Sequence, residues 1–294
     1  GGTAGPATGH MIVSARSKSV LGPWENSPYN PIERTLHNSE QWCSKGHGTL
    51  FEGANGKWWM LFHAYENGHY NMGRQTLLQP VEWTSDGWFK TPKGVKTELP
   101  IKMPSKVLST STFSLNDNFD GDKLKPHWQF FGEYDPSRAE IENNSLRILA
   151  KGNAVGNSSP LLCVPSHRAY TVDVEIDIED NAIGGLVLFY NNSFHSGILA
   201  DNENILANLK GWQFVTEKSA IKNHAFLRMH KKIDNTVDMF YSLDGKEWKK
   251  IENSLDVSGM HHNVLSGFMA LRIGLCSIGE GAVTFKNFNY KPIE

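Results

Sequence analysis

Residues 44–65, SKGHGTLFEGANGKWWMLFHAY, contain two short hydrophobic runs with a turn between them and a histidine just before the first run. The runs flank Asn55 and Gly56, and Asn-Gly is the dipeptide that two-residue β-hairpin turns favour most strongly. Strand-like runs joined by such a turn predict an antiparallel hairpin. His47 lies between two glycines at the start of this hairpin.

Strand-like segments continue on both sides of this hairpin. MGRQTLLQPVEW and GWFK follow it, so residues 47–89 predict four strands, which is the content of one β-propeller blade. Residues 9–36 resemble the second half of such a unit. The chain is therefore expected to carry about one and a half blades. Because a propeller needs roughly four or more to close its ring, the remaining blades are expected upstream of Gly1 or on another chain.

The composition and the periodicity of the sequence change at two points downstream. Residues 97–116 are rich in Pro, Ser, Thr and Lys without periodicity, which predicts a linker after a partial propeller over residues 1–96. Residues 117–294 are a series of short strand-like segments, which predicts an antiparallel β-sandwich of the jelly-roll type. In residues 170–180, YTVDVEIDIED, the strict alternation makes the acidic row the solvent face of a strand rather than a calcium or catalytic cluster.

Composition excludes several classes of function. The 29 basic and 31 acidic side chains nearly cancel, so nothing favours binding to nucleic acid or to an acidic membrane surface. No apolar run approaches the roughly 20 residues that span a bilayer. The three cysteines are far apart and match neither a disulfide framework nor a zinc site. The opening GGTAGPATGH has no initiator methionine and no signal-peptide pattern, so it is interpreted as the interior of a longer protein.

Three motifs carry a family resemblance. GHMIVSARSKSVLGPWENSPYNPI, GHGTLFEGANGKWWMLFHAY and GRQTLLQPVEWTSDGWF occur in this order over residues 9–89. Together they resemble the late blades of glycoside hydrolase family 43. Residues 117–294 are similar to the concanavalin-like sandwich that follows the propeller in β-xylosidases and α-L-arabinofuranosidases of that family.

The resemblance implies an all-β protein with a five-bladed propeller, acting on a pentose-containing oligosaccharide. Such an enzyme releases terminal xylose or arabinofuranose from xylan or arabinoxylan with inversion, and a secreted or periplasmic location is favoured over a cytoplasmic one. Inversion needs two carboxyl groups that flank the bond, and the family adds a third. None has a matching position here, so no catalytic residue is expected in this chain. The alternative is a non-catalytic fragment that binds carbohydrate or is purely structural.

Two site residues follow from the resemblance. His47 in KGHGTLF matches a histidine on the propeller axis that contacts a central metal, usually calcium, largely through water, and it also lines the substrate pocket. Gly46 and Gly48 are expected to let the backbone turn tightly there. Arg74 in MGRQTLLQP matches an arginine that binds sugar hydroxyls and lowers the pKa of the catalytic carboxyls. The competing interpretations are a strand-end histidine and a surface arginine.

Weaker candidates lie near the end of the second run. His63 and Glu66 in FHAYENGHY could line the same pocket, although a solvated loop is the favoured interpretation. Trp58 and Trp59 could stack on a sugar. Because adjacent strand residues point to opposite faces, only one of the two tryptophans can do so, and packing inside the blade is favoured for both.

Overall fold

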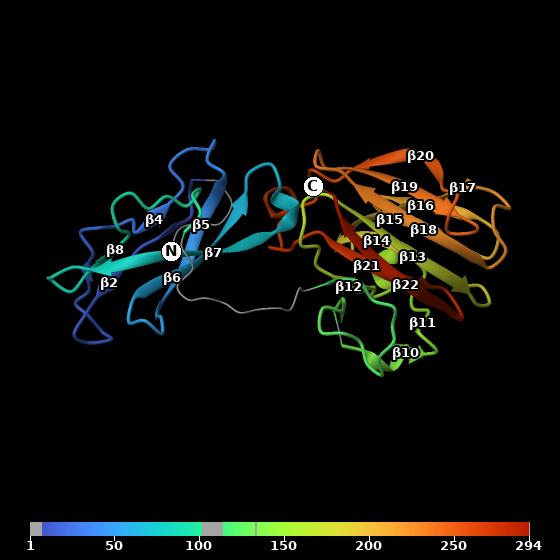
Figure 1. Ribbon diagram of the computed structural model, residues 1–294, viewed down its shortest axis with the longest axis horizontal. Coiled ribbons are helices and arrows are strands. Elements are labelled where there is room, and N and C mark those ends of the chain that lie inside the picture. Colours follow the sequence, from blue (N-terminus) through green and yellow to red (C-terminus); the bar gives the residue numbers. More distant parts are fainter. Residues whose placement is uncertain (1–7, 102–113, 133, 294) are drawn as a thin grey trace. The chain divides into compact units, whose positions relative to one another are not determined.

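The structure is a computed structural model that describes residues 8–101, 114–132 and 134–293, and the regular secondary structure of these residues is almost entirely β (Figure 1). Contacts divide the chain into two compact units. The first is Gly1–Ser111 with Ser266–Phe268, and the second is Thr112–Leu265 with Met269–Glu294. The chain start and most of the expected linker, residues 102–113, lie outside the described residues. No helix in the described part is long and apolar enough to cross a membrane.

The first unit is built on one four-stranded antiparallel sheet, as expected for a propeller blade. Its strands pair in chain order and are β5 (Trp42–Glu52), β6 (Trp58–Glu66), β7 (Arg74–Trp83) and β8 (Phe89–Lys90). The turn between β5 and β6 is longer than Asn55-Gly56 alone, because the amide of Gly53 donates to the carbonyl of Lys57 at 2.8 Å. Before this sheet lie two small antiparallel pairs. They are β1 (Met11–Ile12) with β4 (Glu33–Arg34) and β2 (Ala15–Arg16) with β3 (Glu25–Asn26).

The core of the first unit is small and aliphatic. Ile12 and Ile32 pack on the sheet residues Met60, Phe62 and Val81. Both tryptophans of the second hydrophobic run belong to the packing of the blade. Trp59 is buried, and Trp58 meets Trp83 edge to face with ring centroids 5.3 Å apart. This is the packing role that the alternation of adjacent strand residues predicted.

A buried ion-pair network surrounds Lys45 in β5. Its Nζ atom lies 2.9 Å from Glu40, 3.3 Å from Glu33 and 3.8 Å from Glu98. Although burial acts in the opposite direction, the hydrogen bonds and charges of Glu40 and Glu33 raise the pKa of Lys45. The lysine is therefore charged, and it joins β4 and the segment around Glu98 to the strand that carries His47.

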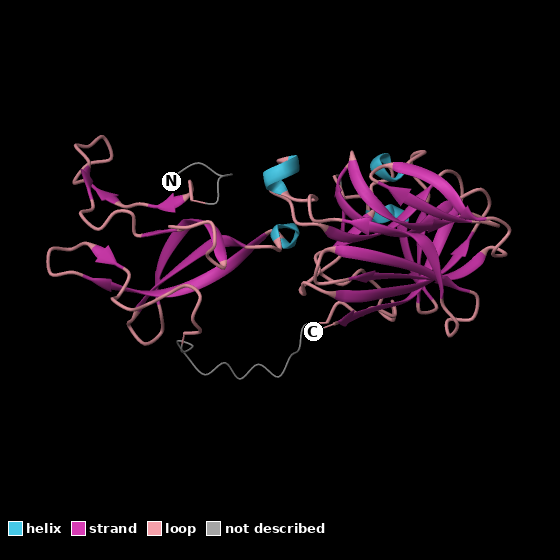
Figure 2. Ribbon diagram, turned by 90° about the horizontal axis from the view of Figure 1, so that it is seen from above, coloured by secondary structure: helices cyan, strands magenta, loops and turns pink. Residues whose placement is uncertain are grey.

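The second unit is a sandwich of two seven-stranded antiparallel sheets (Figure 2). The first sheet consists, in spatial order, of β10 (Ala139–Glu142), β11 (Ser145–Leu149), β22 (Ala282–Pro292), β13 (Tyr170–Ile178), β18 (His224–Lys231), β19 (Thr236–Ser242) and β20 (Lys249–Asp256). The second consists of β17 (Trp212–Glu217), β16 (Ile205–Leu209), β15 (Phe194–Ala200), β14 (Ile183–Asn191), β21 (Arg272–Ile278), β12 (Leu161–Cys163) and β9 (Gln129–Phe130). The described helices are short: 3₁₀ turns at Tyr70–Met72, Pro136–Arg138 and Val155–Asn157, and α1 (His262–Leu265).

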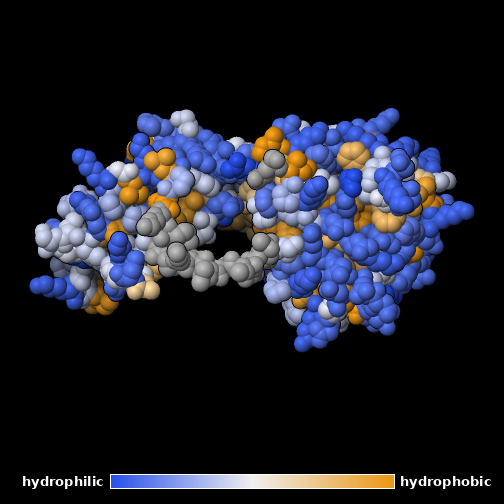
Figure 3. Space-filling model, viewed as in Figure 1, coloured by the Kyte–Doolittle hydropathy of each residue, from blue (hydrophilic) through white to orange (hydrophobic). Residues whose placement is uncertain are grey.

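The sandwich core lies between the two sheets. Val172 and Ile176 of β13 belong to the same buried cluster as Leu186 of β14 and Leu275 of β21. Every second residue of β13 is buried, as the alternation predicted. Figure 3 shows hydrophilic residues over most of the visible face of this unit. The cysteines are free and buried, as expected: Cys43, Cys163 and Cys276.

Asp238 in β19 anchors a polar cluster on the outer face of the first sheet. Its carboxylate lies 2.8 Å from Nζ of both Lys232 and Lys250 and accepts a 2.6 Å hydrogen bond from Ser254. Burial would raise the pKa of Asp238, but the two lysines and the serine hydroxyl hold it well below its ordinary value. A carboxyl whose pKa is lower in the folded than in the unfolded chain stabilises the fold above the unfolded value.

We therefore expect Asp238→Asn to lower the free energy of unfolding by about 1–2 kcal/mol at pH 7. The expected effect is this small because both lysines are partly exposed, and water weakens their attraction to the carboxylate. The stabilisation by Asp238 is complete above about pH 4 and is lost as the pH falls further. Urea unfolding at pH 7 and at pH 3 should show the difference between variant and parent shrinking at the lower pH. The exposed Asp122→Asn is the control. An equal difference at both pH values would contradict the expectation.

Candidate functional site

His47 lies in an irregular part of β5. The pairing of β5 with β6 shifts register on both sides of Gly46, and Ser44 and His47 have positive φ values of 55° and 61°. Positive φ is uncommon for residues other than glycine, and such strain is concentrated at functional sites. The expectation that Gly46 and Gly48 provide the tight turn is wrong, because His47 itself adopts the left-handed conformation.

The two glycines instead provide space, because they have no side chain where neighbouring side chains contact the backbone of β5. A Cβ atom on Gly46 would lie 2.2 Å from Cε1 of His10, so the imidazole of His10 lies directly against the backbone of β5. A Cβ atom on Gly48 would lie 2.9 Å from side-chain atoms of both Ile12 and Met60. The GHG motif therefore lets His10 and β1 pack closely on the blade.

Three histidines come together at this point. The ring centroid of His63 lies 5.2 Å from that of His10 and 5.6 Å from that of His47. One ring nitrogen of each residue can be chosen so that all three lie within 4.8 Å of one another. Sequence reasoning missed His10. It also favoured a solvated loop for His63, and this is wrong because His63 lies within β6 and pairs with Gly46.

The surroundings keep two of these imidazoles neutral. Burial, followed by the positive charge of Arg74 and the neighbouring histidines, lowers the pKa of His63 to about 4. Burial also lowers the pKa of His10, although the carbonyl of Ser44 opposes this shift from 3.2 Å. Both rings are therefore uncharged near neutral pH, with nitrogen lone pairs available to a ligand.

Arg74, the first residue of β7, lies beside the histidines and is partly buried. Its guanidinium carbon is 4.1 Å from the ring centroid of Phe268 and 5.9 Å from that of Tyr65. Burial raises the pKa of Tyr65, and Arg74 opposes the shift. Arg74 therefore lies close to two aromatic rings. Sequence reasoning missed Phe268, which lies almost 200 residues further along the chain.

Glu66, the last residue of β6, is also close to this end of the blade. It is 7% exposed, and Nε2 of Gln41 donates to its carboxylate at 3.4 Å. The solvated loop that was favoured for Glu66 is therefore wrong as well. In the sequence, only the position of Glu66 at the end of an apolar run indicated that it could be buried.

The acidic row of β13 does not provide a vacant metal site. Glu175, Asp177 and His224 lie close enough to share an ion. However, Lys286 already lies 2.6 Å from Asp177 and 3.6 Å from Glu175, and His224 lies 2.8 Å from Asp177. The ammonium group of Lys286 therefore takes the position that a metal ion would need. The acidic row is the charged outer face of the sheet, as the alternation indicated.

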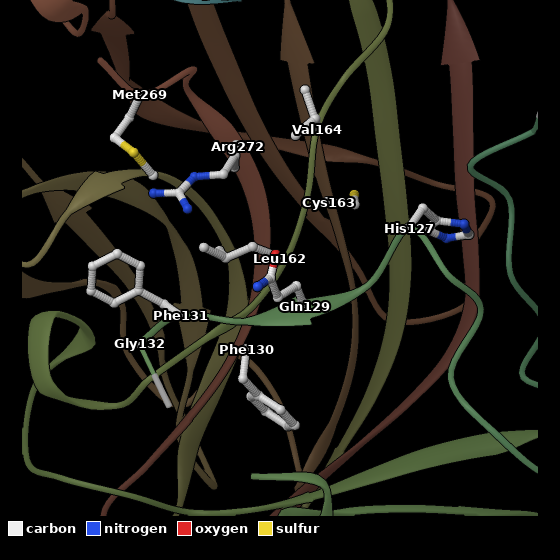
Figure 4. Close-up of a pocket in the computed structure, with 10 residues that line it drawn as sticks. All are labelled: His127, Gln129, Phe130, Phe131, Gly132, Leu162, Cys163, Val164, Met269 and Arg272. Atoms are coloured by element: carbon white, nitrogen blue, oxygen red, sulfur yellow. The ribbon is translucent and has the colours of Figure 1, made fainter. Parts of the chain in front are cut away.

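One cavity of the sandwich has a volume of about 250 Å³ (Figure 4). Arg272, Phe131, Gln129 and Leu162 are among the residues that line it. Nη2 of Arg272 donates to the carbonyl of Tyr190 at 2.8 Å, and burial lowers the pKa of Arg272. This cavity shares no residue with the histidine cluster.

Comparison with family models matches each part of the chain. Residues 1–89 match the glycosyl hydrolases family 43 model, and residues 116–291 match the model of the β-xylosidase C-terminal concanavalin A-like domain. The second match covers more than half of the chain. The chain therefore belongs to glycoside hydrolase family 43.

Curated relatives and solved structures agree with this assignment. A non-reducing end α-L-arabinofuranosidase of Bacteroides ovatus is 26% identical over 92% of this chain and 55% of its own length. A β-xylosidase of Bacillus subtilis is 22% identical over 96% of this chain and 60% of its own. The crystal structure of the GH43 BlXynB protein from Bacillus licheniformis has a TM-score of 0.81 at 26% identity and covers 98% of this chain and 61% of that one. The chain thus spans about 55–61% of the length of these proteins.

Proposed function

We propose that the protein carrying this chain is an exo-acting glycoside hydrolase that releases terminal xylose or arabinofuranose from xylan or arabinoxylan with inversion. The family assignment supports the reaction type, and the names of the relatives support the two pentoses. Such polymers cannot enter a cell intact. A secreted or periplasmic location is therefore part of the proposal.

The observation that carries the proposal is the position of Arg74 among His63, Tyr65 and Phe268. A partly buried guanidinium offers several directed donors, which suit the adjacent hydroxyls of a pentose. Contact with the ring of Phe268 and the nearby ring of Tyr65 restrict the positions of the guanidinium. A fixed positive charge of this kind also lowers the pKa of a nearby carboxyl group and keeps it ionised to act as a base.

The two carboxyl groups of an inverting hydrolase are proposed to come from residues outside this chain. One protonates the leaving oxygen, and the other activates a water on the opposite face of the sugar. In this proposal His47 and Arg74 are positioned to bind the pentose, while the sandwich completes the fold of the protein. The propeller blades beyond residues 1–96 form the rest of the pocket, on the same chain or on a companion chain.

Hydrolysis of p-nitrophenyl β-D-xyloside and p-nitrophenyl α-L-arabinofuranoside tests the proposal. We expect the protein with all of its blades to hydrolyse at least one of them, and proton NMR should show the inverted anomer first. The 294-residue chain alone should show negligible turnover. Binding of xylo-oligosaccharide without hydrolysis by the folded complete protein would instead support a carbohydrate-binding role. Robust turnover by the 294-residue chain would contradict the placement of the catalytic acids.

A further inference from the structure

Three neighbouring strands of the second sheet line one side of the sandwich cavity that Figure 4 shows. Leu162 of β12 pairs with Gln129 of β9 on one side and with Gly274 of β21 on the other. Because residues two apart in a strand share a face, Arg272 lies on the same face of the sheet as Gly274. Gln129, Leu162 and Arg272 therefore project from one face of the sheet into the cavity that all three line.

The aromatic side of the cavity is held in place by packing. Phe131, which follows β9, lines the cavity, and its ring centroid lies 4.8 Å from that of Phe189. The buried ring of Phe189 stacks in turn on the buried ring of His195, with centroids 5.8 Å apart. Leu162 and Met269 supply further apolar surface. Apolar walls with a few polar groups are the usual form of a small-molecule site.

Arg272 brings a positive charge to this cavity, and it is partly buried. Among the described residues, no carboxylate forms an ion pair with it, and its one hydrogen bond runs from Nη2 to the carbonyl of Tyr190. A guanidinium has five N–H donors, and the buried Nε has no partner in the described part of the chain. Burial lowers the pKa of Arg272, because a cation is withdrawn from water without a counter-charge. An anion bound in the cavity would supply that counter-charge.

We propose that this cavity binds a uronic acid and that Arg272 recognises the carboxylate of the sugar. The guanidinium suits a carboxylate because its parallel N–H donors face the two carboxylate oxygens. Phe131 offers an aromatic surface to the apolar face of the sugar ring. The exposed side-chain amide of Gln129 offers both donors and an acceptor to the sugar hydroxyls.

Size and charge select this ligand over other anions. The volume of about 250 Å³ lies below the roughly 300–1,000 Å³ of pockets for drug-sized ligands, so the cavity has room for one monosaccharide. Among the described residues that line it, none is a lysine or a carboxylic acid, and burial keeps the pKa of His127 below its ordinary value. A single positive charge balances one carboxylate, whereas a phosphate monoester carries about −1.5 to −2 at neutral pH.

The inference does not depend on the proposed hydrolysis. All residues that line the cavity belong to the second unit. A uronic acid occurs both as a free sugar and as a branch on a polysaccharide, and both sources present the same carboxylate. The test therefore uses both sources.

The test measures binding of D-glucuronic acid at pH 7 to the protein that carries this chain, by isothermal titration calorimetry. We expect a dissociation constant of about 1 mM or lower. Glucose lacks the carboxylate, acetate lacks the sugar ring, and inorganic phosphate differs in shape and charge. Each of these three should bind at least about tenfold more weakly than glucuronic acid. A xylo-oligosaccharide with a glucuronic acid branch, compared with the unbranched one, shows whether the site accepts the branch.

Two variants test the residues of the cavity. Arg272→Gln should weaken the binding of glucuronic acid by at least about tenfold, because it removes the charge that strengthens the hydrogen bond. Gln129→Ala changes an exposed side chain, so it should leave the fold intact and weaken binding by about three- to tenfold. The melting temperature of each variant without ligand verifies the fold. If Arg272→Gln does not fold, Gln129→Ala and the comparison of ligands still test the proposal.

Arg147→Gln is the matched control, because Arg147 lies in β11 of the other sheet, and its binding of glucuronic acid should be unchanged. Arg74→Ala should likewise leave this binding unchanged even where it abolishes hydrolysis, so failure of the inference and failure of the proposed function are distinguished. Equal affinity for glucose, acetate or phosphate would overturn the proposal. So would binding that Arg74→Ala abolishes, or binding that is insensitive to both cavity variants.

Discussion

Arg74→Ala is expected to lower kcat/KM of the complete protein for a p-nitrophenyl pentoside by about 100- to 1000-fold, the effect of removing a fixed donor that acts on charge in the transition state. Arg74 is partly buried, its charge acts on His63, and its guanidinium lies close to the rings of Tyr65 and Phe268. Alanine removes all of its donors and leaves a space that water can enter. Steady-state kinetics on both pentosides measures the effect.

Arg74→Lys separates charge from geometry. Lysine keeps a positive charge but loses the planar array of donors, so we expect a smaller loss that still exceeds tenfold. The melting temperature of each variant shows whether the fold is intact. Activity of a folded Arg74→Ala protein within tenfold of the parent would mean that Arg74 does not contact the substrate.

Gly197→Ala is expected to destabilise the sandwich by at least about 3 kcal/mol, beyond the usual range for overpacking. Gly197 lies in β15 and pairs with Val187 of β14. A Cβ atom at this position would lie 2.1 Å from the carbonyl oxygen of Leu186 and 2.7 Å from Cα of Val187. Both are backbone atoms, so the conflict is relieved only if the two strands separate. Urea unfolding of the chain followed by tryptophan fluorescence measures the loss.

Gly259→Ala is the matched control for this prediction. A Cβ atom on Gly259 would meet nothing within 4 Å, and its backbone does not require glycine. The same substitution there should change the free energy of unfolding by less than about 0.5 kcal/mol. Equal effects of the two substitutions would show that β14 and β15 can move apart easily, contrary to the packing described above.

Much of the fold followed from local pattern. Alternating burial in β13 and the order of β5 to β8 both come from side-chain periodicity and turn residues that are close in sequence. Such signals are visible in the sequence because hydrophobic residues recur at every second position in a strand that has one buried face. Family motifs added His47 and Arg74 to the candidate site.

The rest of the site depends on long-range packing. The contact of His10 with Gly46 and the approach of His63 to His47 result from a register shift in β5 that no local pattern indicated. The contact of Phe268 with Arg74 also joins residues that lie far apart in the sequence. These contacts depend on where the sheet register places distant residues.

The sequence alone therefore determined the β-rich architecture and the family, because short-range alternation and ordered motifs specify them. Only the tertiary structure decided that three imidazoles converge and that the glycines of GHG provide space rather than a turn. The physical reason is that a bulge in one strand changes which side chains meet across the sheet, and its position depends on the partner strand rather than on neighbours in sequence.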